Sequence, residues 1–139
     1  MSLSIRNQLP GTVTSVTPGE VMATVKVRLD AGQEITAAVT LEAVRELGLT
    51  SGSAVRALVK STEVSLATGP VDGLSIRNRL PGTVTDVASG GAMARVKVRV
   101  AGGELTSAIT EDAVSDLGLT AGSEVVALIK STEVALARV

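Results

Sequence analysis

Two short polar segments contain the residues of this chain that could do chemistry, and each segment occurs twice. One reads SIRN at residues 4–7 and again at 75–78, and the other reads KST at residues 60–62 and again at 130–132. Together they offer a guanidinium, an ammonium, hydroxyls and backbone N–H groups, all of which donate hydrogen bonds. A buried dianion needs such charge-assisted donors, because it must be fully paired once water is removed. The residue types therefore favour a site for a small oxyanion.

Neither segment contains a carboxylate, and this bears on which oxyanion would fit. Phosphate carries a proton near neutral pH and is best recognised with a hydrogen-bond acceptor, whereas molybdate, tungstate and sulfate need donors alone. Glu63 and Glu133 adjoin the KST segments, but strand alternation directs them to the face opposite Val64 and Val134, so we expect them to be solvated. Selection among the three deprotonated oxyanions then depends on the size of the pocket.

A structural interpretation of these residues stays open beside the functional one. An Arg or Lys near the end of a strand is more often a solvated surface charge, and a duplicated segment also retains residues that only hold the fold. Met22 and Met93 are expected to fill the core and not to bind a ligand. Gly11, Gly48 and Gly52 are expected at turns and helix ends, and none belongs to a phosphate-loop pattern.

The composition excludes several classes of protein. The chain has no Cys, no His and no aromatic residue. Disulfides, thiolate nucleophiles, imidazole acid–base catalysis and the commonest metal ligands are therefore excluded. Bases and sugars have no ring to stack on, and the net charge of -1 argues against a broad basic surface for nucleic acid. We expect a protein that is not an enzyme and does not bind nucleic acid, with no cofactor and no metal held directly by protein ligands.

The paired segments belong to a tandem duplication that covers nearly the whole chain. LSIRNQLPGTV at residues 3–13 returns as LSIRNRLPGTV at 74–84, and LGLT and KSTEV follow in the same order in both copies. One residue is missing from the second copy near Gly102 and Gly103, where a hairpin is predicted. Residues 68–73 (TGPVDG) have the composition of a linker. We predict a first domain over residues 1–68, a linker at 69–73 and a second domain over 74–139.

Hydrophobic periodicity indicates that each copy is mainly β. Apolar and polar residues alternate over residues 21–29, the pattern of a strand with one buried face. Thr40 stands where a helix N-cap would, and Gly48 where a helix would end, so one short helix is predicted between them. The other predicted strands of the first copy cover residues 12–16, 34–40, 55–59 and 64–66.

About five short strands and one short helix in each copy predict two tandem small β-barrels of the OB-like kind, with a meander sandwich as the alternative. A copy of about 65 residues without aromatic side chains has little apolar surface to bury and no disulfide to staple it. Packing against the twin copy and against other subunits is the remaining source of stability. We therefore expect a homo-oligomer.

The residues SIRNQLPGTV, followed by AAVT and LVKSTEV, resemble the Mop family of small molybdate-binding domains, also called molbindins. Both halves match over nearly the whole chain, which fits the tandem, or di-Mop, type. The resemblance implies an OB-like β-barrel, a trimer of chains and anions bound between domains. It also implies sites of a second type nearer the three-fold axis.

The resemblance further implies a set of anion-binding residues. In the first half they are Ser4, the backbone N–H of Ile5, Arg6, Lys60 and Ser61, completed by Thr40 from a neighbouring domain. In the second half they are Ser75, Ile76, Arg77, Lys130, Ser131 and Thr110.

The chain departs from the family pattern at two pairs of positions. Ile5 and Ile76 replace the usual Ala, which could narrow the pocket. Ala43 and Ala113 stand where some relatives supply a second hydroxyl, so a lower affinity is expected.

The resulting prediction is reversible binding of molybdate or tungstate for storage or homeostasis in the cytoplasm, without catalysis. No apolar run approaches the roughly 20 residues that span a bilayer, and no signal pattern begins the chain, so no membrane partner is expected. The alternative is an interaction or regulatory module that presents a ligand-dependent surface to another protein. The chain contains no helix-turn-helix segment and no ATPase motif, so the resemblance is to a free-standing binding protein.

Overall fold

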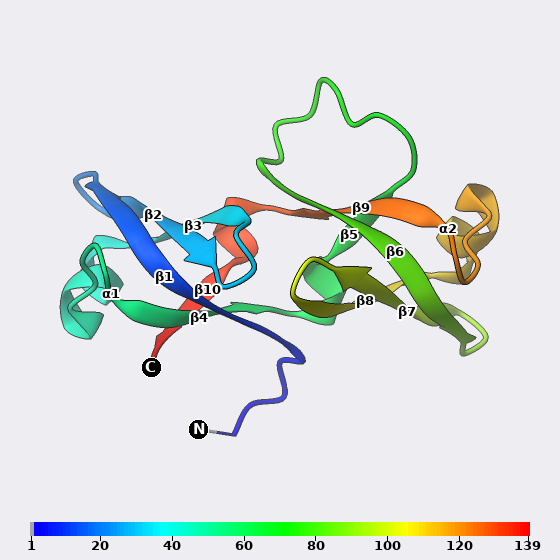
Figure 1. Cartoon of the computed structure of the whole chain (residues 1–139), viewed down its shortest axis with the longest axis horizontal. Coiled ribbons are helices and arrows are strands. Elements are labelled where there is room, and N and C mark those ends of the chain that lie inside the picture. The colour runs from blue at the N-terminus through cyan, green and yellow to red at the C-terminus, as the bar shows by residue number, and fades with distance from the viewer. Residues whose placement is uncertain (1) are drawn as a thin grey trace.

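The protein, seen in a computed structural model that describes residues 2–139, consists of two similar halves (Figure 1). Each half is a curled five-stranded antiparallel sheet, and one short helix lies at its outer end. The two sheets lie side by side along the long axis of the molecule. The expected fold class, mainly β with two tandem OB-like units and one short helix in each, is confirmed.

The elements of the two copies correspond one to one. The first copy contains β1 (Asn7–Pro18), β2 (Met22–Leu29), β3 (Glu34–Thr40), α1 (Leu41–Leu47), β4 (Ala54–Val59), the short 3-10 turn η1 (Ser61–Glu63) and β5 (Ser65–Ala67). The second contains β6 (Asn78–Ser89), β7 (Met93–Val100), β8 (Gly103–Thr110), α2 (Glu111–Leu117), β9 (Glu124–Ile129), η2 (Ser131–Glu133) and β10 (Ala135–Arg138).

Strand alternation is regular in β2, where buried and exposed residues follow one another without a break. Ala23, Val25 and Val27 are almost wholly buried, which confirms the strand predicted from period two. The same alternation turns Met22 outward. Met22 and its counterpart Met93 are each 46% exposed, so the prediction that they fill the core was wrong.

The first strand is longer than its sequence suggests. β1 begins at Asn7 and runs through Pro10 and Gly11, where a turn was expected, because Gly11 pairs with Leu29 on one side and with Val55 on the other. A Cβ at Gly11 would lie 2.6 Å from the carbonyl oxygen of Arg28. The glycine therefore permits a close approach of β2 and is not a turn residue.

The helix predicted after β3 is confirmed with both of its ends. The hydroxyl of Thr40 accepts a hydrogen bond from the N–H of Ala43, and Gly48 takes the left-handed conformation that ends α1. After β4 the chain forms η1, and the final strand of this copy begins at Ser65, one residue later than predicted.

The last strand of each copy joins the sheet of the other copy. β10 pairs with β4 and completes the sheet of β1, β2 and β3, while β5 pairs with β9 and completes the sheet of β6, β7 and β8 (Figure 1). The predicted domain ranges, 1–68 and 74–139 with a linker at 69–73, follow the repeat in the sequence. Each sheet, however, contains four strands from one of these domain ranges and one strand from the other.

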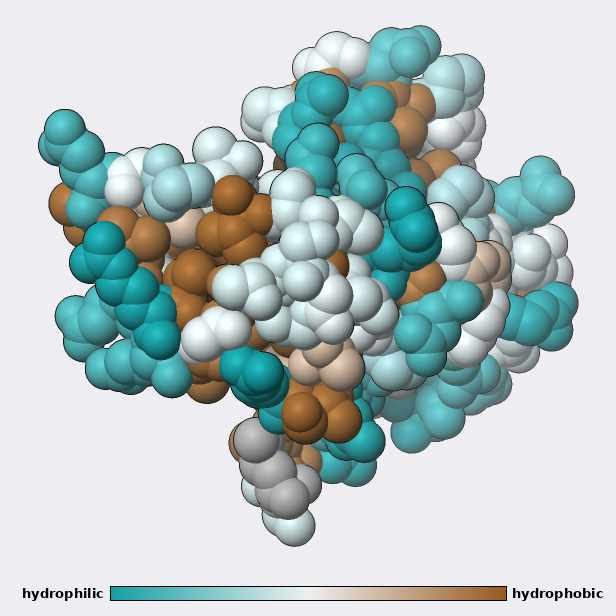
Figure 2. Space-filling model, turned by 60° about the vertical axis from the view of Figure 1, so that its left-hand side comes forward, coloured by the Kyte–Doolittle hydropathy of each residue, from teal (hydrophilic) through white to brown (hydrophobic). Residues whose placement is uncertain are grey.

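A single buried cluster of aliphatic side chains spans both halves. Val13, Val25 and Val59 of the first copy belong to the same cluster as Leu80 and Leu105 of the second. On the face shown in Figure 2, apolar side chains gather in patches between hydrophilic ones. Among residues 2–139, no helix has the length and apolar character needed to cross a membrane.

Candidate functional site

Strand register brings the SIRN and KST segments together within each half. β1 runs antiparallel to β4 with Asn7 paired to Val59, so the residues before Asn7 and after Val59 leave the ladder at the same end. In the second half, Asn78 pairs with Ile129 in the same way. Segments that are distant in the sequence thus become neighbours through the pairing of the strands.

In the second half the two segments line one hollow of about 350 Å³. The lining residues are Ser75, Ile76, Arg77, Lys130, Ser131 and Thr132. All except Thr132 are among the expected site residues, and the side chains of Arg77 and Lys130 provide two exposed cations. Thr110, which was expected to complete a pocket from a neighbouring domain, does not line this hollow.

A second hollow, of about 380 Å³, lies beside the KST segment of the first half. Ile5, Thr40 and Lys60 of the expected set line it, together with residues 132–135 of the second copy. Ser4, Arg6 and Ser61 are not part of its lining. Thr132 lines both hollows, so the two adjoin through the turn η2.

Glu133 also lines the hollow that contains Lys60, and it is half-buried. Strand alternation does not determine its direction, because residues 131–133 form a 3-10 turn. A carboxylate in the hollow opposes the binding of an anion. The second-half hollow, which Arg77 and Lys130 line without a carboxylate, is therefore better suited to a dianion.

The asparagines of the SIRN segments hold the two halves together. The side-chain amide of Asn7 exchanges two hydrogen bonds with the backbone of Thr106, and that of Asn78 exchanges two with the backbone of Thr36. Both asparagines are only 2% exposed. Each amide donates one hydrogen bond and accepts one in these pairings, so both asparagines have a structural role within segments that were predicted to be donor clusters.

The arginines of the two SIRN segments differ in what they contact. Arg6 folds back, and its Nε and Nη2 donate to the carbonyl oxygens of Ser4 and Leu3 at 3.2 and 3.0 Å. The guanidinium of Arg77 makes no hydrogen bond to any residue in the range 2–139, and it lines the second-half hollow. The second-half hollow therefore has its arginine beside its lysine, whereas Arg6 does not line the hollow beside Lys60.

Thr40 and Thr110 have a confirmed structural role. Each hydroxyl accepts a hydrogen bond of 3.1 Å from the N–H three residues later and caps the following helix. A hydroxyl that accepts in this way still has its own proton to donate. Thr40 can therefore cap α1 and, at the same time, donate a hydrogen bond into the hollow beside Lys60.

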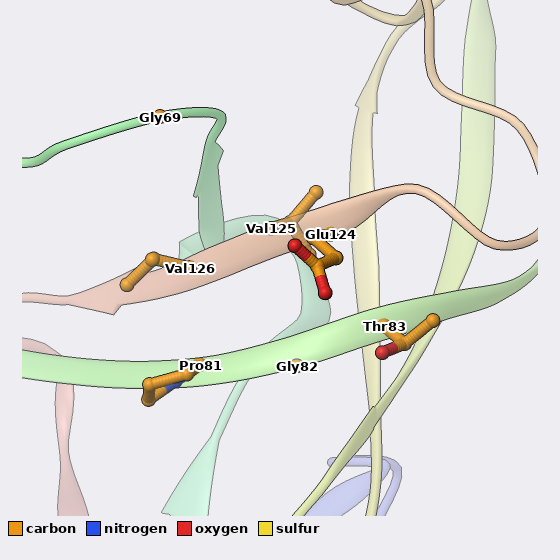
Figure 3. Close-up of a pocket in the computed structure, with 7 residues that line it drawn as sticks. All are labelled: Gly69, Pro81, Gly82, Thr83, Glu124, Val125 and Val126. Atoms are coloured by element: carbon orange, nitrogen blue, oxygen red, sulfur yellow. The ribbon is translucent and has the colours of Figure 1, made fainter.

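A larger hollow elsewhere in the second half is unsuited to an anion. About 550 Å³ lies between β6, β9 and the segment that follows β5, and it is lined by Gly69, Pro81, Gly82, Thr83, Glu124, Val125 and Val126 (Figure 3). The carboxylate of Glu124 is the one charged group in that lining. The size of a hollow thus does not identify the site, and its donors do.

Comparison with known proteins connects this arrangement with molybdenum. The family model of the TOBE domain matches residues 3–66 and again residues 74–136. A solved structure of the cytoplasmic molybdate-binding protein ModG, with molybdate bound, superposes with a TM-score of 0.95 at 41% sequence identity, and the match covers 98% of both chains.

Two curated relatives are similar over almost all of the chain. The molybdenum-pterin-binding protein MopB of Rhodobacter capsulatus is 41% identical over 136 residues, which are 96% of this chain and 50% of MopB. The molybdenum transport protein ModE of Azotobacter vinelandii is 40% identical over 138 residues, which are 99% of this chain and 51% of ModE. The chain spans about half the length of these curated relatives. It belongs to the TOBE-domain family and contains the domain twice, as its tandem Mop-like motifs predict.

Proposed function

We propose that this protein reversibly binds molybdate, or tungstate, and stores it within the cytoplasm without chemical change. The observation that carries the proposal is the second-half hollow, which the cations of Arg77 and Lys130 line together with the hydroxyls of Ser75 and Ser131. Two cations balance the charge of a dianion, and the hydroxyls and backbone N–H groups satisfy its remaining oxygens. The proposed ligand-binding residues are Ser4, Ile5, Arg6, Thr40, Lys60, Ser61, Ser75, Ile76, Arg77, Thr110, Lys130 and Ser131.

The likeness to ModG supports the choice of ligand. That protein is described as a cytoplasmic molybdate-binding protein and its structure contains molybdate, and the match extends over 98% of both chains. The curated relatives named above are described as a molybdenum-pterin-binding protein and a molybdenum transport protein, and neither description names a reaction. We therefore infer binding without catalysis, so molybdate released from the protein is expected to be chemically unchanged.

We propose further that the binding species is a homotrimer. The hollow beside Arg77 is open, so an anion in it keeps much of its water until another surface covers it. Thr110 of a neighbouring chain is the residue that we expect to supply this cover. Exposed apolar side chains at Val21, Met22 and Met93 give such chains surface to bury on association.

Isothermal titration of the full chain with molybdate tests the binding proposal. Saturable uptake at micromolar concentrations is expected for molybdate and tungstate, and weaker uptake for phosphate, which is protonated and finds no carboxylate acceptor among the residues that line the second-half hollow. The absence of saturable molybdate binding would refute the function.

Storage and assembly need two further measurements. Protein purified from molybdate-fed cells is expected to retain molybdenum by elemental analysis. Light scattering during size-exclusion chromatography is expected to give the mass of three chains. If the protein has the mass of a single chain and still binds molybdate tightly, the role of Thr110 from a neighbouring chain is contradicted.

A further inference from the structure

The two copies hold their site arginines differently, and the cause lies two residues further along each strand. The guanidinium of Arg6 donates hydrogen bonds to the carbonyl oxygens of Leu3 and Ser4. Arg77, at the corresponding position, makes no such contact within the part of the chain that the structure describes, and it lines the hollow with Lys130.

The position two residues after the site arginine is Gln8 in the first copy and Arg79 in the second. Arg79 donates from Nε to the carbonyl oxygen of Ile76 at 3.0 Å and from Nη2 to that of Leu74 at 2.9 Å. Leu74 is the counterpart of Leu3. A neighbouring arginine thus takes the loop carbonyl in the second copy that Arg6 takes in the first.

Gln8 is too short to do the same. Its single amide donates to the carbonyl oxygen of Ile5 at 3.1 Å, and this leaves the Leu3 carbonyl to Arg6. On its other side Gln8 accepts from Nη1 of Arg56 at 3.4 Å. The counterpart of Arg56 is Val126, so each copy places one arginine in this pair of positions, on opposite strands.

We propose that the residue at position 8, and its counterpart Arg79, positions the site arginine and sets the affinity of each half for the anion, while the residue at position 56 or 126 only balances its charge. Arg79 holds the loop carbonyls and leaves Arg77 free, whereas Arg6 must leave two carbonyls before it reaches an anion. Two such hydrogen bonds correspond to about a five- to tenfold lower affinity in the first half. This inference rests on the proposed function, and it identifies Arg79 as a positioning residue.

Transplanting the pair tests the inference at constant net charge. Gln8→Arg with Arg56→Val gives the first half the residues of the second, and Arg79→Gln with Val126→Arg does the reverse. Each exchange is made in a background in which both cations of the other half are removed, Arg77→Ala with Lys130→Ala for the first exchange and Arg6→Ala with Lys60→Ala for the second. Molybdate titration then reports one class of sites at a time.

The expected results are opposite for the two exchanges. Gln8→Arg/Arg56→Val is expected to tighten first-half binding about five- to tenfold, and Arg79→Gln/Val126→Arg to weaken second-half binding by a similar factor. Arg56→Val alone and Val126→Arg alone are the controls and are expected to change affinity less than twofold. Thermal melting identifies any exchange that fails to fold.

An NMR readout of arginine Nε–H exchange follows the contacts themselves, independently of affinity. In the wild type, Nε–H of Arg6 and Arg79 is expected to exchange slowly and that of Arg77 quickly. The first exchange is expected to transfer the protection from Arg6 to the new arginine at position 8.

The outcomes separate this inference from the function on which it rests. A wild type without saturable molybdate binding overturns both. A wild type that binds, with equal affinities in the two halves or with affinities that the exchanges leave unaltered, overturns the inference alone. Loss of protection at Arg6 without tighter first-half binding also overturns it.

Discussion

The side-chain amide of Asn7 pairs with the backbone of Thr106 as a neighbouring strand would. Its Nδ2 donates to the Thr106 carbonyl oxygen and its Oδ1 accepts from the Thr106 N–H, both at 2.8 Å. Asn78 makes the corresponding pair with Thr36 at 2.8 and 2.7 Å. Two hydrogen bonds thus connect the end of each binding segment to the opposite half of the molecule, four in all.

Asn7→Ala is expected to lower the free energy of unfolding by about 2–4 kcal/mol, because it leaves the donor and the acceptor of Thr106 unpaired in a buried site. Asn78→Ala is expected to cost a similar amount through Thr36. Urea denaturation followed by circular dichroism measures both. Thr14→Ala, which removes one exposed hydrogen bond to the carbonyl of Lys26, is the control and is expected to stay within about 0.5 kcal/mol of the wild type. If Asn7→Ala and Asn78→Ala lower the free energy of unfolding no more than the control does, the amide pairs do not hold the two halves together.

The isolated first copy, residues 1–68, is expected to fail as a folded monomer. Its sheet lacks β10 (residues 135–138), which leaves β4 with an unpaired edge, and its own β5 has no sheet to join. We expect dimers or larger species in which β5 of one copy takes the place of β10 in another. Light scattering and circular dichroism decide the outcome, and a monomer with native β structure would contradict the role assigned to the exchanged strands.

Arg77→Ala and Lys130→Ala are each expected to weaken the second-half class of molybdate sites at least tenfold. Removing one partner of a charge-assisted contact in a covered pocket costs about 2–5 kcal/mol. Arg6→Ala and Lys60→Ala are expected to weaken the other class, with a smaller effect for Arg6 because its guanidinium is already engaged. Titration calorimetry measures each. Arg99→Ala, which removes an equal charge from the exposed side of β7, is the control. An equal loss of molybdate affinity in this variant would show that net charge, and not a direct contact, causes the weakening.

Thr40→Asp separates the capping role of this residue from its role in binding. Asp caps a helix as well as Thr, so the free energy of unfolding is expected to stay within about 0.5 kcal/mol of the wild type. Its carboxylate faces the hollow that Lys60 lines, so molybdate binding at first-half sites is expected to be lost. Thr40→Ala removes the capping hydroxyl and is expected to lower the free energy of unfolding by about 1 kcal/mol. Tight binding by Thr40→Asp would remove Thr40 from the site.

Gly11→Ala is expected to destabilise the fold by about 1–3 kcal/mol, because its Cβ would lie 2.6 Å from the carbonyl oxygen of Arg28 and 2.8 Å from Cγ1 of Val27. Gly103→Ala is the matched control, since a Cβ there meets nothing within 4 Å. Urea denaturation compares the two variants, and a Gly11→Ala protein as stable as the control would contradict the close approach of β1 and β2.

Local signals in the sequence predicted the elements that depend on one strand or one turn. The alternation in residues 21–29 gave β2 because one face of a strand is buried, and Thr40 with Gly48 gave both ends of α1. Pro10 and Gly11 were misread because glycine serves both tight turns and close strand contacts, and only the register with Leu29 and Val55 distinguishes them.

The candidate site was predictable in its residue types but not in its partners. The second-half donors do share a hollow, since strand pairing brings residues 75–77 beside residues 130–132. The burial of Asn7 against Thr106 and the entry of Glu133 into the hollow with Lys60 depend on contacts between copies, which no local pattern encodes. The difference between Gln8 and Arg79 is visible in the sequence, but its effect on the site arginines follows only from the hydrogen bonds that these side chains make to loop carbonyls in the structure.

The exchange of final strands also bears on biosynthesis. As the chain leaves the ribosome, β1 to β4 emerge with an open edge, and the strand that closes it in the folded chain, residues 135–138, is made after all of them. Nascent chains that stall in between expose this edge to one another. The first sheet is therefore completed only after residues 135–138 have been made, late in the synthesis of the two copies.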